Sequence, residues 1–288
     1  MKKRSLAILI LPLAIIILFV IWRNQQNMKK IAKFNSKAIY VYNLTDDKEV
    51  LAVNENEKLP MASLTKMMTV LVSLEKIPDI SAKTTVDTQS YQRLIDENAS
   101  MAGFYGGEEV SYRDLLYGAM LPSGGEAADS LAINISGSIL QFTGLMNDKA
   151  KELGLTNTHF QNADGMDEPG HYSSAKDMAM LLKEALKNGD FRAIFTKKDF
   201  TSSQSPDHPM GVYMQSTVFT KLENYEQNGF EIIGGKSGTT EKAGLCWISL
   251  AYKNGCEYIV VTMGAPYTDI NNTGDGQIKD TLSILEDL

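Results

Sequence analysis

Strand-like segments stand near both ends of this chain and helix-like segments fill its middle, and this order limits the possible folds more than any other feature. Alternating apolar residues at 38–44 and 49–53 predict a hairpin near the start. Three more strands are predicted near the end, at 231–237, 245–252 and 257–263. Asn254-Gly255 lies between the last two of these and is a strong hairpin turn. The two groups of strands together predict one antiparallel sheet.

Helical periodicity dominates the part of the chain between these two groups of strands. One helix is expected to begin at Ser111, and others are expected at 126–135, 140–153, 174–187 and 277–286. A chain of 288 residues with 43% hydrophobic residues is large enough for one sizeable core. We therefore predict an α/β fold of the α+β kind, in which a five-stranded antiparallel sheet is flanked by helices and lies beside a helical subdomain.

The segment Ser63-Leu64-Thr65-Lys66 opens the helical region, and most of the residues that follow it are apolar. This pattern predicts a helix buried in the domain centre, where a lysine is unusual unless it has a partner or a function. Residues i and i+3 share a helix face, so Lys66 is expected beside Ser63. Burial lowers the pKa of a lysine, and a neutral lysine can act as the base for a serine nucleophile. Ser63 and Lys66 are therefore candidates for nucleophile and base.

The pattern Ser-x-x-Lys occurs twice more, and neither copy has this setting. Ser73 and Lys76 fall at the end of the same predicted helix, where the helix dipole favours a cation such as Lys76. Ser173 and Lys176 lie at a helix start, in which Ser174 begins a variant of the capping box. We interpret both copies as structural.

Two segments downstream complete a pattern of serine enzymes that no single motif would indicate. Ser123-Gly124 comes first, and Lys236-Ser237-Gly238-Thr239 follows it. A second cation at Lys236 would lower the pKa of Lys66 further and attract an anionic substrate. Gly238 has no Cβ and allows a ligand to approach the backbone closely, and the Thr239 hydroxyl can bind a carboxylate.

At these residues the chain resembles the serine-type D-alanyl-D-alanine carboxypeptidases, which are the low-molecular-mass penicillin-binding proteins. The resemblance extends over nearly all of residues 38–288, and it is carried by the segments 60–67, 158–166, 170–179 and 236–244. It implies a β-lactamase/transpeptidase-like fold and an enzyme that needs no cofactor or metal ion. The implied partners are peptidoglycan pentapeptide stems, with β-lactam antibiotics as acylating inhibitors. The final helix ends the chain, so the further C-terminal β domain of some members is expected to be absent.

The resemblance also implies a role for each motif residue. Ser63 would attack the penultimate carbonyl of a D-Ala-D-Ala peptide, Lys66 would be the base, and Ser123 would relay a proton to the leaving amine. The implied substrate-binding residues are Lys236, Ser237, Gly238 and Thr239. The main-chain N–H groups of Ser63 and Thr239 would form the oxyanion hole.

Two positions depart from the family pattern. Gly125 stands where the second motif, Ser-x-Asn, has its asparagine. Several relatives carry an arginine near the segment that corresponds to 264–270, and this chain has none there. Binding of the substrate carboxylate would then rest on Lys236 with Thr239 and Thr240.

Residues 6–22 form an apolar run that follows Lys2, Lys3 and Arg4. Its length is at the lower limit for a bilayer span. No small-x-small cleavage site follows the run, so a signal-anchor is favoured over a cleaved signal peptide. We expect residues 1–33 to comprise a short cytoplasmic end, a transmembrane anchor and a linker, and residues 34–288 to be the extracytoplasmic penicillin-binding domain.

The chain has a formal net charge of −7. Six of the 28 Lys and Arg residues fall within residues 1–30, which contain no acidic residue, so the rest of the chain is more acidic still. An acidic domain of this kind argues against nucleic acid as a partner. Three histidines, at 159, 171 and 208, lack the spacing of a zinc site. With Asn254-Gly255 as a turn, Cys246 faces about Met263, far from Cys256 along the strands. The two sulfur atoms are then roughly 20 Å apart, too far for a disulfide.

Two other functions remain open. A serine β-lactamase shares the three motifs but uses a glutamate to activate the deacylating water. Glu168 is the available acid in a suitable loop, although it lacks the Glu-x-x-Leu-Asn context. A catalytically weakened protein that binds wall peptides is the other alternative, and Gly125 is its only support.

Overall fold

The computed structural model of this protein describes residues 33–269 and 274–288. The expected membrane segment at 6–22 lies outside these residues. Among the residues described, no helix has the length and apolar character needed to cross a bilayer.

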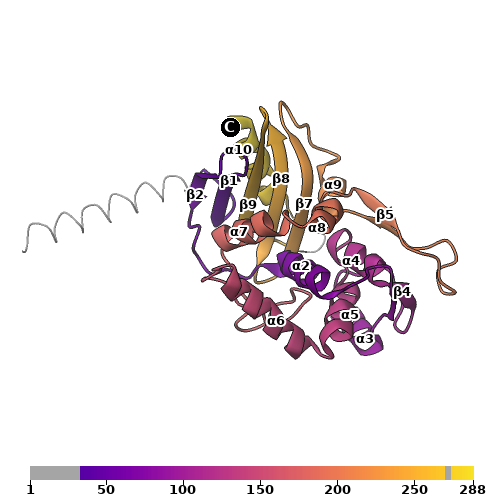
Figure 1. Cartoon of the computed structure of the whole chain (residues 1–288). Coiled ribbons are helices and arrows are strands. Elements are labelled where there is room, and N and C mark those ends of the chain that lie inside the picture. Colours follow the sequence, from indigo (N-terminus) through magenta and orange to yellow (C-terminus); the bar gives the residue numbers. More distant parts are fainter. Residues whose placement is uncertain (1–32, 270–273) are drawn as a thin grey trace, which may run out of the picture.

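A five-stranded antiparallel sheet forms one half of the molecule (Figure 1), as predicted from the sequence. Its strand order is β2-β1-β9-β8-β7. The strands are β1 (Ala38–Asn43), β2 (Lys48–Val53), β7 (Glu231–Thr240), β8 (Gly244–Lys253) and β9 (Cys256–Ala265). Strand β1 pairs with β9, so the two ends of the described chain meet in the sheet centre.

The β8–β9 hairpin has the predicted turn. Lys253 is paired with Cys256, and Asn254 and Gly255 both have positive φ angles, of 52° and 82°. A bulge interrupts the register between Leu245 and Trp247. Cys246 lies in this bulge at the other end of the hairpin, and both thiols are free. The prediction that the cysteines are unpaired is therefore confirmed.

Helices cover both faces of the sheet and build the second half of the molecule (Figure 1). They are η1 (Ala62–Thr65), a 3₁₀ turn, and the α-helices α2 (Lys66–Lys76), α3 (Thr88–Asp96), α4 (Tyr112–Met120), α5 (Gly125–Ser136), α6 (Ile139–Glu152), α7 (Ala175–Ala185), α8 (Gly189–Phe195), α9 (Thr217–Leu222) and α10 (Gly276–Asp287). Two short two-stranded sheets lie in the helical part. One pairs β3 (Lys83–Thr85) with β4 (Glu109–Ser111), which α3 separates in sequence, and the other pairs β5 (Asp199–Thr201) with β6 (Tyr213–Gln215).

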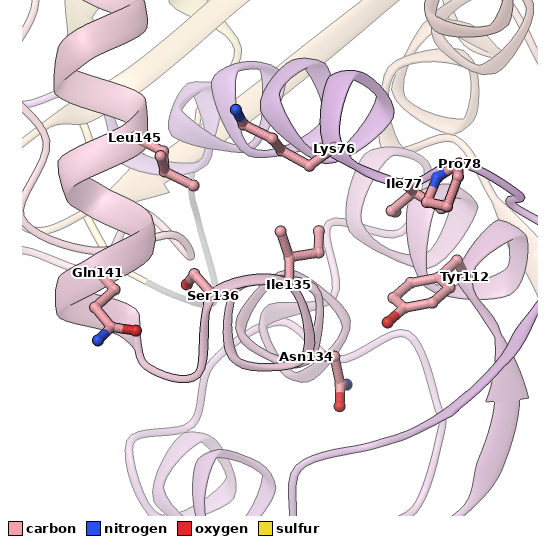
Figure 2. Close-up of a pocket in the computed structure, with 9 residues that line it drawn as sticks. All are labelled: Lys76, Ile77, Pro78, Tyr112, Asn134, Ile135, Ser136, Gln141 and Leu145. Atoms are coloured by element: carbon pink, nitrogen blue, oxygen red, sulfur yellow. The ribbon is translucent and has the colours of Figure 1, made fainter.

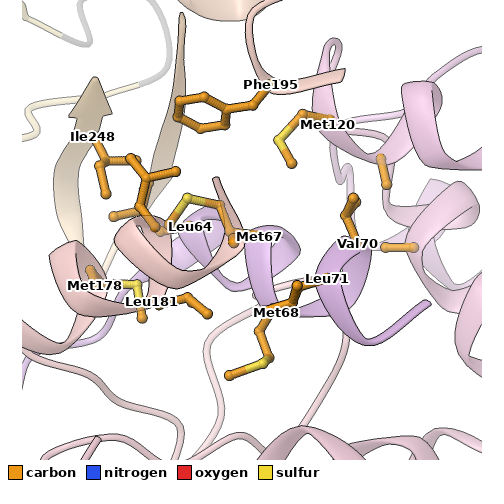
Figure 3. Close-up of a cluster of buried hydrophobic side chains, with 14 of the residues drawn as sticks. Leu64, Met67, Met68, Val70, Leu71, Met120, Met178, Leu181, Phe195 and Ile248 are labelled. Atoms are coloured by element: carbon orange, nitrogen blue, oxygen red, sulfur yellow. The ribbon is translucent and has the colours of Figure 1, made fainter. Parts of the chain in front are cut away.

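Helix α2 lies at the junction of the two halves, which confirms the prediction of a buried central helix. Figure 3 shows side chains of η1 and α2 packed among those of α7, α8 and β8. Leu64, Met67 and Met68 are fully buried. A second core forms on the opposite face of the sheet, where Trp247 packs with the apolar side of α10. Every residue of α2 from Lys66 to Ser73 is buried.

The predicted helix starts are present, with one difference. Ser111 and Asp114 form a complete capping box at the start of α4. At α7, the Ser174 hydroxyl accepts a hydrogen bond from the Asp177 N–H at 3.2 Å. The Asp177 carboxylate instead accepts from the Asn157 N–H at 2.7 Å. Only the Ser174 half of the predicted capping box is therefore present, and Asp177 binds the loop at Asn157 to the helix.

Candidate active site

Ser63 and Lys66 lie side by side where η1 continues into α2. The Lys66 ammonium donates to Ser63 Oγ at 3.0 Å, the contact expected from their i, i+3 spacing. It also donates to the main-chain carbonyl of Asp164. Lys66 is 2% exposed, so these two oxygens and the surrounding core fix its position.

The second and third motifs meet behind this pair. Lys236 is fully buried on β7 and donates to Ser123 Oγ at 2.8 Å and to the Ser237 carbonyl at 2.9 Å. Ser123 has a φ of +69°, an unusual conformation for a residue with a side chain. The next residue, Gly124, packs so closely that a Cβ there would lie 2.6 Å from the Ala102 methyl group. Tight packing of the Gly124 backbone thus holds Ser123 against Lys236.

The glycine of the third motif has a packing role that the sequence did not indicate. A Cβ at Gly238 would lie 2.8 Å from the main-chain nitrogen of Ser63, so β7 touches the backbone of the 3₁₀ turn η1. The Ser237 hydroxyl is bonded to Thr217 Oγ1 on α9 at 2.9 Å. The sequence does not point to Thr217, because its partner lies 20 residues away along the chain.

A cleft of about 1000 Å³ opens over Ser63 and Lys66. Gly125 and Thr239 also line it, together with the carboxylate-bearing residues Glu97, Asp164, Asp167, Glu241 and Asp269. Ser123, Lys236, Ser237 and Gly238 are not among the residues that line this cleft. The predicted site residues therefore form two layers, with the serine–lysine pair in the cleft wall and Lys236–Ser123 in the buried layer behind it.

Burial is the main cause of the pKa changes of both lysines. It lowers the pKa of Lys66, although the carboxylates of Asp164, Asp129 and Glu126 act in the opposite direction. It lowers the pKa of Lys236 well below the usual lysine value, and the charge of Lys66 adds to this effect. Burial was the first cause of a lowered pKa expected from the sequence for Lys66. The expected further lowering by Lys236 is not among the causes for Lys66, and the effect acts instead from Lys66 on the pKa of Lys236.

An ion-pair network beside Lys66 was missed from the sequence. Arg93 on α3 donates to Asp129 Oδ2 on α5 and to Asp164 Oδ2, each at 2.7 Å. Both carboxylates are 1% exposed. Because the Asp164 carbonyl accepts the hydrogen bond of Lys66, Arg93 helps to fix the loop that holds the lysine. No sequence signal pointed to these residues, which lie 36 and 71 positions apart from Arg93.

Gly125 begins α5 and faces Leu94. Its N–H donates to the Ser100 carbonyl at 2.7 Å. A Cβ at this position would lie 3.1 Å from each terminal methyl group of Leu94 and 3.5 Å from Ser100 O. A larger side chain here thus requires Leu94 to move by a few tenths of an ångström.

The other two Ser-x-x-Lys copies have structural surroundings. Ser73 Oγ is buried and has no hydrogen-bond partner within the described residues. Lys76 lies at a separate pocket of about 540 Å³ at the end of α2, which Figure 2 shows with Tyr112 and Ile135 on its other sides. The Ser173 hydroxyl is bonded to Thr158 Oγ1 at 2.8 Å, and the Lys176 ammonium lies 5.8 Å from the centre of the Tyr40 ring.

Comparison with known proteins identifies the same family that the sequence motifs resemble, and it does so over most of the chain. A family model for D-alanyl-D-alanine carboxypeptidases matches residues 24–267. D-alanyl-D-alanine carboxypeptidase DacF of Bacillus subtilis is 35% identical over 74% of this chain and 53% of its own length. DacC of Escherichia coli is 34% identical over 74% of this chain and 52% of its own length. The chain thus spans about half the length of these two relatives.

Solved structures agree on the fold. A crystal structure of the DD-transpeptidase of Streptomyces strain K15 has a TM-score of 0.76 and 26% identity, covering 88% of this chain and 98% of that protein. Penicillin-binding protein D2 of Listeria monocytogenes, in an ampicillin-bound form, has a TM-score of 0.70 at 24% identity, covering 88% of this chain and 96% of that one. From the extent of the family match and the shared fold, we conclude that the chain belongs to the D-alanyl-D-alanine carboxypeptidase family.

Proposed function

We propose that this protein is a serine D-alanyl-D-alanine carboxypeptidase, which removes the terminal D-alanine from peptidoglycan stem peptides. The observation that carries the proposal is the 3.0 Å contact between Ser63 Oγ and the buried Lys66 Nζ in the wall of a cleft of about 1000 Å³. The contact joins a nucleophile to a base whose pKa is lowered by burial. The names of its family relatives support the choice of substrate.

In the proposed reaction, neutral Lys66 takes the proton of Ser63 Oγ while that oxygen attacks the penultimate carbonyl carbon. The N–H groups of Ser63 and Thr239 stabilise the resulting oxyanion. The intermediate collapses when the C–N bond breaks, and the leaving amine of D-alanine receives, through Ser123, the proton that Lys66 had taken, so Lys66 is neutral again for the attack of water. Lys236 supports this relay because it donates to Ser123 Oγ at 2.8 Å.

Water then hydrolyses the acyl-enzyme and releases the shortened stem peptide. The substrate carboxylate is held by the positive field of Lys236 and by the hydroxyl of Thr239, which lines the cleft. An amine in place of water would give transpeptidation, the activity named for the Streptomyces neighbour. Digestion of a D-Ala-D-Ala peptide with and without added glycine measures both products.

The β-lactamase alternative depends on Glu168, and its surroundings do not favour it. Glu168 is not among the residues that line the cleft. Its carboxylate accepts a hydrogen bond from the Asn162 side chain at 3.3 Å. The weakened wall-peptide-binding alternative depends on Gly125, and the kinetics of a Gly125 variant, considered below, test it.

The proposal includes the location of the enzyme. Residues 1–33 form the anchor segment, and residues 34–288 form the penicillin-binding domain outside the cytoplasmic membrane. Protease treatment of intact protoplasts tests this division. Digestion of the domain at the cell surface, with a retained membrane fragment, is expected, while a mature soluble form that begins after Trp22 would show a cleaved signal peptide.

Labelling with a penicillin tests the central assignment. Mass mapping of the labelled peptide should place one acyl group on Ser63, and Ser63→Ala should abolish the label. Ser73→Ala and Ser173→Ala serve as matched controls and should label as the wild type does. A label on Ser73 or Ser173, or a Ser63→Ala protein that still labels, contradicts the assignment.

A further inference from the structure

The residue before the nucleophile has an unfavourable backbone conformation. Ala62 has a φ of +49° and is 1% exposed. A residue with a Cβ rarely adopts this left-handed region, and it does so only where its surroundings hold it there. Something in the structure therefore stabilises the peptide that joins Ala62 to Ser63.

A chain of three hydrogen bonds ends on that peptide. Thr65 Oγ1 donates to the Ala62 carbonyl at 2.7 Å. His171 Nε2 lies 2.7 Å from the same Thr65 oxygen, and the Gln161 N–H donates to His171 Nδ1 at 3.0 Å. The residues of this chain come from η1 and from two positions about 100 residues downstream.

The direction of every proton in this chain follows from its first donor. A main-chain N–H can only donate, so His171 Nδ1 must be the unprotonated nitrogen of a neutral ring. The ring proton is then on Nε2, which donates to Thr65 Oγ1. The hydroxyl has one proton, and it is directed to the Ala62 carbonyl.

The surroundings of His171 keep the ring neutral. The ring is 5% exposed and lies at the edge of the buried Phe160 ring. Burial lowers the pKa of His171 to about 4. The other charged and titratable groups act in both directions, since the carboxylates of Asp164 and Asp167 raise the pKa and the charges of His159 and Lys66 lower it.

Fixing the Ala62 carbonyl also fixes the Ser63 N–H. The two groups belong to one planar trans peptide and point in opposite directions. On the carbonyl side, a Cβ at Gly165 would lie 2.3 Å from Ala62 O. On the nitrogen side, a Cβ at Gly238 would lie 2.8 Å from Ser63 N. The peptide is thus enclosed between a loop and β7, and the hydrogen bond from Thr65 sets its rotation.

We propose that Thr65 and His171 are positioning residues, which hold the Ala62–Ser63 peptide so that the Ser63 N–H points into the oxyanion hole beside Thr239. This inference rests on the function proposed above. Both residues are buried, and neither is among the residues that line the cleft. Their effect is on the direction of one donor, and it is therefore largest where the oxyanion develops, in the acylation step.

Thr65→Val tests the proposal, because it keeps the shape of the side chain and removes the hydroxyl. Thr65→Ser is the matched control that keeps the hydroxyl. Acylation by a penicillin is followed by stopped flow and resolved into the dissociation constant of the noncovalent complex and the first-order acylation rate constant. The labelled amplitude counts the competent molecules, so a loss of folded protein changes the amplitude and leaves the rate constant unchanged.

Thr65→Val should lower the acylation rate constant by about 10- to 100-fold, which is less than the roughly 10²- to 10³-fold cost of removing an oxyanion donor, because the Ser63 N–H is misdirected but still present. The noncovalent dissociation constant of Thr65→Val should stay within about threefold of the wild-type value. Thr65→Ser keeps the hydroxyl and should be acylated at a rate close to that of the wild type. Affinity for a boronic acid that mimics the tetrahedral intermediate should fall in parallel with the rate constant. His171→Phe removes the ring donor and should show the same selective loss.

The outcomes separate this inference from the proposed function. A wild-type protein that is not acylated at Ser63 overturns the proposed function and the inference with it. A wild-type protein that is acylated, beside a Thr65→Val protein with an unchanged rate constant, overturns the inference alone. A loss confined to the noncovalent dissociation constant also overturns it, since the donor would then act on binding and not on the oxyanion.

Discussion

At the scale of single residues, Lys66 is held between a hydroxyl and a main-chain carbonyl, and both of these oxygens accept its protons. Such a lysine becomes a base when its pKa is low enough for the neutral form to be populated. Burial lowers the pKa of Lys66, so acylation should become faster as the pH rises through that lowered pKa.

Lys66→Ala should abolish acylation of Ser63 and leave the fold intact, because it removes the base. Lys236→Ala should chiefly raise KM for an anionic peptide, together with some loss of kcat, because Lys236 supplies positive charge and a donor to Ser123. Lys236→Arg keeps the charge and is the control for the electrostatic part. A Lys66→Ala protein that is acylated at the wild-type rate would identify another group as the base.

Gly125→Asn should make the enzyme faster, by roughly tenfold in kcat/KM, since an asparagine amide adds a contact worth about 1–3 kcal/mol. Leu94 must move slightly, because a Cβ at Gly125 lies 3.1 Å from its methyl groups. Gly125→Ala adds the Cβ without the amide and measures this steric cost alone. If kcat/KM falls equally in both variants while their circular dichroism spectra stay intact, then Gly125 does not mark the loss of a catalytic contact.

At the scale of elements, α4 begins at a carboxylate that also binds a distant segment. Asp114 accepts from Ser111 N and Oγ at 2.9 and 2.6 Å, and from Ser203 N and Oγ at 3.0 and 2.6 Å. Burial alone would raise the pKa of Asp114, but the hydrogen bonds from Ser111 and Ser203 together lower it. The carboxylate of Asp114 therefore links the start of α4 to the segment that follows β5 through hydrogen bonds.

Asp114→Asn should lower the free energy of unfolding by about 2 kcal/mol at pH 7, because it weakens hydrogen bonds to a charged acceptor. The folded-state pKa lies below the unfolded value, so the wild-type advantage is present above about pH 4 and is lost as the pH falls further. Urea titrations from pH 7 to 3 measure the difference. Ser111→Ala keeps the charge and should cost about 1 kcal/mol. A difference that stays constant over this range contradicts the assignment.

At the scale of the whole molecule, Arg93 joins helices α3 and α5 to the loop that holds Lys66. Its partners Asp129 and Asp164 are both buried. Burial and the neighbouring Asp164 raise the pKa of Asp129 to about 7, and Arg93 opposes that rise. Removal of the guanidinium would leave two buried carboxylates beside each other without a cation between them.

Arg93→Ala should destabilise the protein by about 2–3 kcal/mol near pH 8, because two buried carboxylates lose their partner. This is less than the cost for a fully buried pair, since Arg93 is 41% exposed and water can reach the space that it leaves. The loss should shrink as the pH falls, because a carboxyl whose folded-state pKa is raised can take up a proton and become neutral. Urea unfolding at pH 8 and pH 5 measures this change. Arg93→Ala combined with Asp129→Asn removes one of the unpaired charges and should recover part of the stability at pH 8. Equal losses at both pH values contradict this account.

Much of the architecture followed from local patterns along the chain. The sheet strands, their joining turn at Asn254-Gly255 and the caps at Ser111 and Ser174 were predicted from periodicity and turn chemistry. The two-stranded sheets β3–β4 and β5–β6 were not predicted, because strands of three residues are too short to show alternation. Helices α3 and α8 lie in the region predicted to be helical but were not predicted individually, and the six-residue helix α9 was missed because it is too short to show helical periodicity.

The sequence by itself determined the longer strands and helices and the pairing of Ser63 with Lys66, because both follow from local patterns along the chain. Tertiary structure alone decided which groups act on that pair. Asp164 binds Lys66, Arg93 binds Asp164, and His171 binds Thr65, so the three residues act on the pair through neighbours from positions about 30 to 110 residues away. No periodicity encodes such contacts. The left-handed turn at Ala62 is likewise decided by its surroundings, since an alanine would not adopt it unless distant hydrogen bonds and close packing held it there.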